Sequence, residues 1–187
     1  MKSIDIIHAE HRALAAVLQA LRAVVAEIRA GQLQPDFQLL SAMVDYITQL
    51  PEKVHHPKED QLLFPLLRAR SAKAAELIAR LQEQHLQGER MTLALMQSLI
   101  HYQSLGSAGF AAFDALVQQY LDFNWTHLNL EEKELLPIAR EALSAHDWQE
   151  LDAAFSANAD PFAGAKGEFE ALFRRIVQLT PAPYGLG

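Results

Sequence analysis

Cysteine is missing from the 187-residue chain, and this excludes disulfides, thiolate metal sites and cysteine nucleophiles. Glycine and proline are scarce, at 8 residues each, whereas alanine, leucine, glutamine and glutamate are plentiful, a mixture that favours helix. Basic residues are in the minority: 16 lysines and arginines against 23 aspartates and glutamates leave a net charge of −7. We therefore expect neither nucleic acid nor an anionic membrane surface as a partner.

Long apolar runs are missing as well. No stretch approaches the roughly 20 residues of a membrane span. The opening MKSIDIIHAEHRAL carries charges and histidines where a signal peptide would be continuously apolar. Half of the residues are nevertheless hydrophobic, which is enough for a packed core in one compact domain. We expect a cytoplasmic protein that does not interact with membranes.

An amphipathic pattern predicts the first helix over residues 4–28. Its inward positions follow alternate steps of three and four residues, as in one helix of a bundle. These positions are Ile4, Ile7, His11, Leu14, Leu18, Leu21, Val25 and Ile28. His11 is their one polar member. Ser3 is the predicted N-cap and Gly31 the predicted stop.

Three further helical regions are predicted. The second spans about 35–70, with a break or kink expected near Pro51 and Pro57 in the first turn of the next piece. The third spans about 72–104, a turn follows at 106–109, and the fourth spans about 109–143. The predicted fold is an all-α, up-down-up-down four-helix bundle over 1–143. Residues 144–187 are predicted to form a short helical C-terminal extension and tail that pack on the bundle or at a homodimer contact.

A motif occurs twice. Residues 55–68 read HHPKEDQLLFPLLR and residues 127–140 read HLNLEEKELLPIAR. Both have histidine first, acids at the fourth and fifth positions after it, then leucine at the eighth, proline at the tenth and arginine at the thirteenth. The repeat indicates that the second and fourth helices carry the same pattern of side chains in the same register.

The repeated spacing brings metal-binding side chains together. Residues four apart share one helix face, so each motif pairs an imidazole with a carboxylate. The first and third helices each add a histidine on their apolar face. A single inward histidine is usually only a hydrogen-bonded core residue, but burying this whole set without a metal would be costly. Four imidazoles and two carboxylates suit two iron or manganese ions in a bundle. The predicted metal ligands are His11, His55, Glu59, His85, His127 and Glu131.

With these residues in place, the sequence resembles the hemerythrin-like family, in its HHE cation-binding branch of the bacterial type. That branch has the pattern His … His-x-x-x-Glu … His … His-x-x-x-Glu, which the six predicted ligands match over about residues 1–143. The resemblance implies a non-haem di-iron centre (Fe2+/Fe3+), bridged by the two carboxylates and an oxo or hydroxo group. Manganese or zinc would be substitutes.

The chain departs from the oxygen-carrying hemerythrins at two positions. Those proteins have a second histidine four residues after the one on the third helix, where this chain has Glu89. They also place the last carboxylate five residues after its histidine, whereas this chain offers both Glu131 and Glu132. We predict Glu131 as the ligand because its position matches that of Glu59. The loss of an imidazole at position 89 argues against stable reversible O2 carriage.

Several neighbouring residues keep more than one interpretation. Glu89 binds metal, binds another ligand's side chain, or faces solvent. Tyr120 donates a hydrogen bond to the centre, acts as a ligand, or is a core tyrosine with a satisfied hydroxyl. Gly88 leaves room for a small ligand or allows close helix packing. His56 and Asp60 form a parallel pair, rotated by about 100°, that would replace His55 and Glu59 if the second helix were rotated. His8 is expected beside the centre or at the surface, and His101 and His146 at the surface.

Competing functions follow from this pattern. The first is a di-iron protein that binds or senses O2, NO or peroxide. The second is a di-iron enzyme that reduces peroxide or NO, and the third is a metal-free helical interaction protein. An iron store is disfavoured because no mineral-nucleating feature is visible. No catalytic residue is assigned, and the chain is expected to be a metal and ligand binder rather than an enzyme.

Overall fold

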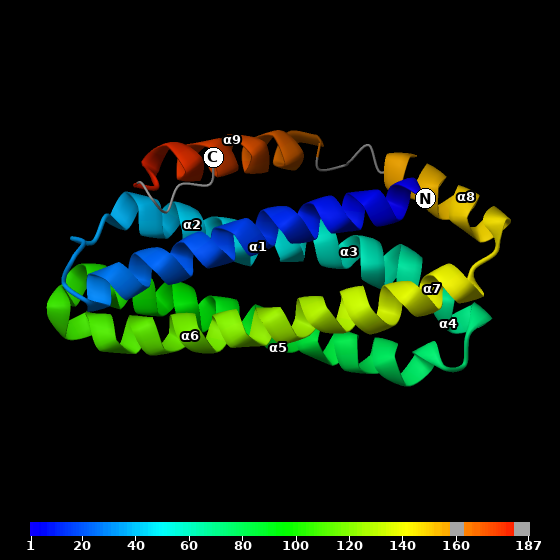
Figure 1. The fold of residues 1–187 in the computed structure, drawn as a ribbon, viewed down its shortest axis with the longest axis horizontal. Helices are drawn as coiled ribbons and strands as arrows, with labels where there is room; N and C mark the ends of the chain where they lie inside the picture. Colours follow the sequence, from blue (N-terminus) through cyan, green and yellow to red (C-terminus); the bar gives the residue numbers. More distant parts are fainter. Residues whose placement is uncertain (158–162, 182–187) are drawn as a thin grey trace.

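The computed structural model describes residues 1–157 and 163–181, and all the regular elements in these ranges are helical (Figure 1). The all-α class is therefore confirmed. The label η marks short π-helical segments, in which the helix is locally wider. In chain order the elements are α1 (Lys2–Arg29), α2 (Phe37–Leu50), η1 (Pro51–His55), α3 (His56–Lys58), η2 (Glu59–Leu63), α4 (Phe64–Arg70), α5 (Ala74–Leu105), α6 (Ser107–Leu130), η3 (Glu131–Leu135), α7 (Leu136–Ala142), α8 (Ala145–Ala157) and α9 (Ala163–Leu179).

The long helices lie side by side along the longest axis of the molecule (Figure 1). Helix α5 packs along α6, α1 packs against α2 and α6, and α2 packs against α5. Figure 1 also shows α9 along one outer face and α8 near the N-terminus, and α8 contacts α1 while α9 contacts α2. The helices thus enclose one continuous interior along the axis.

That interior contains two clusters of buried apolar side chains. The larger cluster includes Leu14, Met43 and Leu95, and the smaller one includes Ile7 and Leu81. On α1, residue 11 falls between Ile7 of one cluster and Leu14 of the other. A layer of polar side chains is therefore held between two apolar layers, which keeps it away from water.

The prolines change the helix type without ending the helix. At Pro51, where a break or kink was predicted, the chain does not break but remains helical and widens into η1. Segments η2 and η3 each end two residues before a proline, Pro65 and Pro137. Proline lacks an N–H, and its ring crowds the carbonyl four residues earlier. A wider turn relieves that crowding, so the second region is one continuous, locally widened helix.

Helix α1 begins earlier than predicted. Its first residue is Lys2, so the prediction of Ser3 as the N-cap is wrong. Ser3 is buried inside the first turn, where its amide and its hydroxyl each donate to Oδ1 of Asp152 at 2.7 Å. This bond ties the start of α1 to α8. Gly31, the predicted stop, has a φ of +71° just beyond the end of α1, and the prediction is confirmed.

The turn predicted at 106–109 is shorter than expected. Helix α6 already begins at Ser107, and Gly106 alone makes the reversal, with a φ of +60°. At Gly109 a Cβ atom would lie 2.7 Å from Cα of Tyr102 on α5. The glycine therefore allows the first turn of α6 to press against the last turn of α5.

The C-terminal segment packs on the bundle in this chain. The rings of Tyr46 on α2 and Phe173 on α9 are 5.6 Å apart, and Ile176 is fully buried. The predicted boundary at residue 144 stays a prediction, and the NADPFAG stretch and the tail lie mostly outside the described residues. No helix within residues 1–157 and 163–181 combines the length and apolar character needed to cross a membrane.

Candidate metal centre

The six predicted ligands converge in the polar layer between the two apolar clusters. They come from α1, η1, η2, α5, α6 and η3, so each of the four predicted helical regions of the bundle contributes. The side chains of Glu59 and Glu131 are fully inaccessible to solvent, and the four histidines are at most 6% exposed. Such burial of ionisable groups requires strong compensation.

Each copy of the motif brings its histidine and its glutamate together as predicted. Nε2 of His55 lies 3.6 Å from Oε2 of Glu59, and Nε2 of His127 lies 3.2 Å from Oε1 of Glu131. In both copies the glutamate is the first residue of a π-helical segment. The wider turn therefore begins at the carboxylate itself.

The two carboxylates each face two pairs of histidines, His11 with His55 and His85 with His127. Oε2 of Glu131 lies 3.1 Å from Nε2 of His11, while its Oε1 lies 3.2 Å from Nε2 of His127. Oε2 of Glu59 lies 3.6 Å from Nε2 of His55 and also 3.6 Å from Nε2 of His85. Each carboxylate thus stands between one histidine of each pair, the position that a bridging ligand needs.

All four histidines turn their Nδ1 atoms outward to a fixed acceptor. A carboxylate or amide oxygen can only accept, so each Nδ1 is the donor and each Nε2 keeps its lone pair toward the centre in the neutral ring. The four pairs are His11 with Glu132 at 2.7 Å, His55 with Glu10 at 3.0 Å, His85 with Asp60 at 3.0 Å, and His127 with Gln84 at 3.0 Å.

The outer acceptors are themselves held in place. The ammonium of Lys58 donates to Glu10, and the amide of Gln82 donates to Asp60 at 3.2 Å. Nε2 of His8 lies 3.2 Å from Glu132. The imidazoles are therefore oriented through a second layer of contacts, which is characteristic of metal-binding histidines.

Unlike the outward Nδ1 atoms, several of the atoms that face the centre have no hydrogen-bond partner among the residues that the structure describes. Both oxygens of Glu59 and of Glu131, and Nε2 of His85 and of His127, make no hydrogen bond within the described part of the chain. Leaving one such group unpaired costs about 1–3 kcal/mol, and more for a charged one. Nitrogen and oxygen donors facing one another in this way fit a divalent transition metal.

The pair of His11 and His55 also fits a bound cation. Nε2 of His11 and Nε2 of His55 are 2.9 Å apart, and both Nδ1 atoms are already directed at carboxylates. Two lone pairs this close repel each other unless a proton or a metal ion lies between them. The donor set therefore fits a bound cation on this side as well.

Ionisation of the centre reflects the crowding of its charges. Burial and the adjacent carboxylate of Glu131 raise the pKa of Glu59 to about 8. Although burial opposes it, the neighbouring histidines hold the pKa of Glu131 well below its usual range. Burial lowers the pKa of His85, but Asp60, Glu131 and Glu59 outweigh it and raise this pKa to about 9. Without metal, the centre therefore holds protons that a metal ion would displace.

The structure distinguishes between the interpretations that the sequence left open for the neighbouring residues. Glu89 is exposed on α5. The hydroxyl of Tyr120 donates to the carbonyl of Ile47 at 2.6 Å and so belongs to the core. A Cβ on Gly88 would lie 3.4 Å from the Phe123 ring, which fits close packing. His101 and His146 are exposed, as expected.

Sequence reasoning gave His56 no role of its own, yet it lies at the centre. Its ring stacks on that of His85 with a centroid distance of 3.8 Å, and nitrogens of His56, His85 and His127 lie within 4.8 Å of one another. The adjacent histidines in the first motif were the available signal. Because His55 and His56 were treated as alternatives, the sequence did not predict that both lie at the centre.

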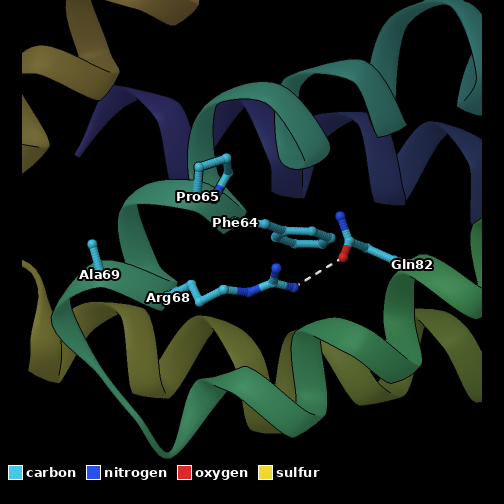
Figure 2. A pocket seen from close by; sticks show the side chains of 5 residues that line it. All are labelled: Phe64, Pro65, Arg68, Ala69 and Gln82. Carbon is cyan, nitrogen blue, oxygen red and sulfur yellow. Dashed lines mark hydrogen bonds between the residues drawn. The ribbon is translucent and has the colours of Figure 1, made fainter.

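Figure 2 shows a pocket formed by residues of α4 and α5. Its lining consists of Phe64, Pro65, Arg68, Ala69 and Gln82. Arg68 donates to the side-chain oxygen of Gln82 at 3.0 Å, and Gln82 in turn donates to Asp60. The pocket is therefore connected by hydrogen bonds to the acceptor that orients His85.

Comparison with known proteins agrees with the donor set. The sequence matches the family model described as the hemerythrin HHE cation binding domain over residues 2–139. No match was found among the curated proteins or the solved structures.

Proposed function

The chain belongs to the hemerythrin HHE cation-binding family, and we propose that it binds two iron ions and uses them to bind or sense O2, NO or peroxide. The observation that carries the proposal is the position of Glu59 and Glu131. Their buried oxygens lack hydrogen bonds within the described chain and lie between two pairs of histidines. A carboxylate in that position would bridge two metal ions.

The six ligands divide into two sets. His11 and His55 would hold one ion, and His85 and His127 the other, with both glutamates shared. Nitrogens of His11 and His55 and oxygens of both glutamates lie within 4.8 Å of one another, which supports the first set. Nε2 of His85 and of His127 lie 3.8 and 3.2 Å from Oε1 of Glu131, which supports the second.

Iron is proposed as the metal, with manganese or zinc as substitutes, because imidazole and carboxylate donors accept all three. When bound, an iron pair supplies open coordination and one-electron chemistry for a small ligand. The chain's own contribution is to orient the imidazoles through Glu10, Asp60, Gln84 and Glu132 and to exclude bulk water with the two apolar clusters. The exposed Glu89 supports binding or sensing over reversible O2 carriage.

The remaining predictions stay with this proposal. An up-down-up-down order is supported by the packing of α1 on α2 and α6 and of α5 on α6. A bundle domain over 1–143, a cytoplasmic location and a homodimer contact stay predictions.

Iron content and spectrum test the proposal. Protein loaded with Fe(II) and then exposed to air should contain about two irons per chain and show the near-ultraviolet bands of a bridged ferric pair. Glu131→Gln should lose this centre, whereas Glu134→Gln, an exposed acid in the same segment, should keep it. Addition of O2, NO or peroxide to the reduced protein should change the spectrum. A folded wild-type protein that gains neither iron nor stability on addition of Fe(II) would contradict the proposal.

A further inference from the structure

We propose that His56 is a metal ligand, the third imidazole of the metal position held by His85 and His127. The inference rests on the proposed dinuclear centre and adds to it an inequality between the two positions. One position would have two histidines and the other three.

The placement of the His56 ring carries the proposal. It lies against the ring of His85, 3.8 Å between centroids and only 14° from parallel, and 5.6 Å from the ring of His127. Its side chain is 12% exposed. Together the three residues offer nitrogen atoms that all lie within 4.8 Å of one another. Stacked rings direct their lone pairs side by side, so binding one ion requires a rotation of the His56 side chain.

The hydrogen bonding of His56 supports the same role. Its Nδ1 is buried and makes no hydrogen bond within the described residues. The nearest acid, Glu52, is 3.6 Å away, beyond hydrogen-bond distance. A buried imidazole nitrogen without a hydrogen bond is costly unless a further partner satisfies it. A metal ion shared with His85 and His127 would satisfy the ring.

The two adjacent histidines of the first motif then serve different ions. Successive residues of a helix point about 100° apart, so neighbours reach different sides of the centre. His55 ends η1 and faces His11, with ring centroids 4.6 Å apart, whereas His56 begins α3 and faces His85. The pair was first considered as two alternative registers, but both members lie at the centre.

No other described side chain supplies this third imidazole. One turn after His85, Glu89 is exposed. In the second motif the position that matches His56 is Leu128, a member of the larger apolar cluster. With three imidazoles on one ion and two on the other, the position of His11 and His55 would have fewer protein donors.

Cobalt titration tests the inference on the whole chain. Co(II) is added to metal-free wild type, to His56→Ala and to the control His101→Ala, an exposed histidine. Visible absorption and competition with a chelator report each binding step. We expect two ions in wild type and in the control. In His56→Ala we expect an unchanged first step and a second step weakened by at least about 10-fold, restored by added imidazole.

The outcomes are distinct for the two proposals. If wild type binds no metal, the proposed function fails. If His56→Ala binds two ions with the wild-type affinities and spectrum, only the role of His56 fails. A measurement on wild type removes dependence on the folding of the variant. In the proton NMR spectrum of the dicobalt protein, five strongly shifted, exchangeable imidazole N–H signals support the proposal, and four overturn it.

Discussion

The two copies of the repeated motif place equivalent residues in equivalent positions, except at one position. In each, the first acid after the histidine enters the centre and the second binds the outer nitrogen of a histidine on another helix. Asp60 does so for His85, and Glu132 does so for His11. The spacing therefore encodes both a buried acid that faces the four histidines and an acid that orients an imidazole.

The copies differ at the residue that follows the histidine. The first has His56, stacked on His85, and the second has Leu128, packed in an apolar cluster. The electrostatics differ as well, since the pKa of Glu59 is raised to about 8 while that of Glu131 is lowered. A symmetrical frame thus holds an asymmetrical site, and each prediction below tests one side of that contrast.

The largest difference is expected between the two inner glutamates in metal-free protein. Glu131 is the negative partner of several buried histidines, so Glu131→Gln should lower the free energy of unfolding by about 3 kcal/mol. Glu59→Gln replaces a carboxyl that burial already disfavours as an anion, and at pH 8 it should cost little or even stabilise. Urea unfolding in the presence of a chelator measures both. Equal losses in the two variants would mean that the contrast is wrong.

The outer acids should behave alike in the two copies. Asp60→Asn and Glu132→Gln each weaken the hydrogen bond that orients a metal-binding imidazole, and we expect metal affinity to fall about 10–100-fold in both. Chelator competition measures the change, with Glu134→Gln as the exposed control. If one variant matched wild type, the functional equivalence of the two copies would be lost.

Acidity should separate the metal-free and metal-loaded forms. Glu59 and His85 have folded-state pKa values of about 8 and about 9, above their ordinary values of 4.5 and 6.5. The stability they provide is complete below the ordinary values and is lost as the pH rises through the raised ones. Between its ordinary and its raised pKa each group loses about 1.4 kcal/mol of stabilisation per pH unit, so metal-free protein should lose several kcal/mol between pH 6 and 9. Metal affinity should rise over the same range, because binding displaces protons.

Thermal unfolding across that pH range, with and without metal, checks the opposite slopes. In Glu59→Gln the fall of the metal-free form should be shallower. Parallel slopes in the two forms would contradict the displacement of protons by metal.

The smallest effect is expected at the arginine that ends each motif. Arg68 is exposed and donates to Gln82 (Figure 2), which in turn donates to Asp60. Because this contact with the centre is indirect, Arg68→Gln should lower metal affinity by less than about threefold. Arg140, also exposed, should be replaceable by glutamine without effect. A large loss in the Arg140 variant would show that the arginine matters to the motif in a way that this structure does not explain.

Much of the fold follows from periodicity. The inward seam of α1 and the repeated motif were sufficient to predict helices, the two pairs of histidine and glutamate, and the inward direction of His11 and His85. Periodicity reports which face is buried, but not how the backbone responds locally. The π-helical turns before Pro65 and Pro137, and Ser3 donating to Asp152 rather than capping α1, depend on local crowding and on partners distant in sequence.

The outer contacts of the centre were harder to predict for the same reason. Glu10 binds His55 from another helix, and no local pattern connects two residues so far apart. Glu132 and Asp60 were visible in the motif, but their direction toward a different helix depends on how the helices pack. Predicting that His56 lies at the centre would have required knowing that both adjacent histidines, His55 and His56, reach the same interior.

Iron-edge anomalous diffraction from crystals of the iron-loaded protein tests the central claim most directly. Two separate iron peaks should appear in the polar layer, one beside His11 and His55 and one beside His85 and His127, with the carboxylates of Glu59 and Glu131 between them. A single peak, or iron bound only outside this layer, would contradict a dinuclear centre in this protein.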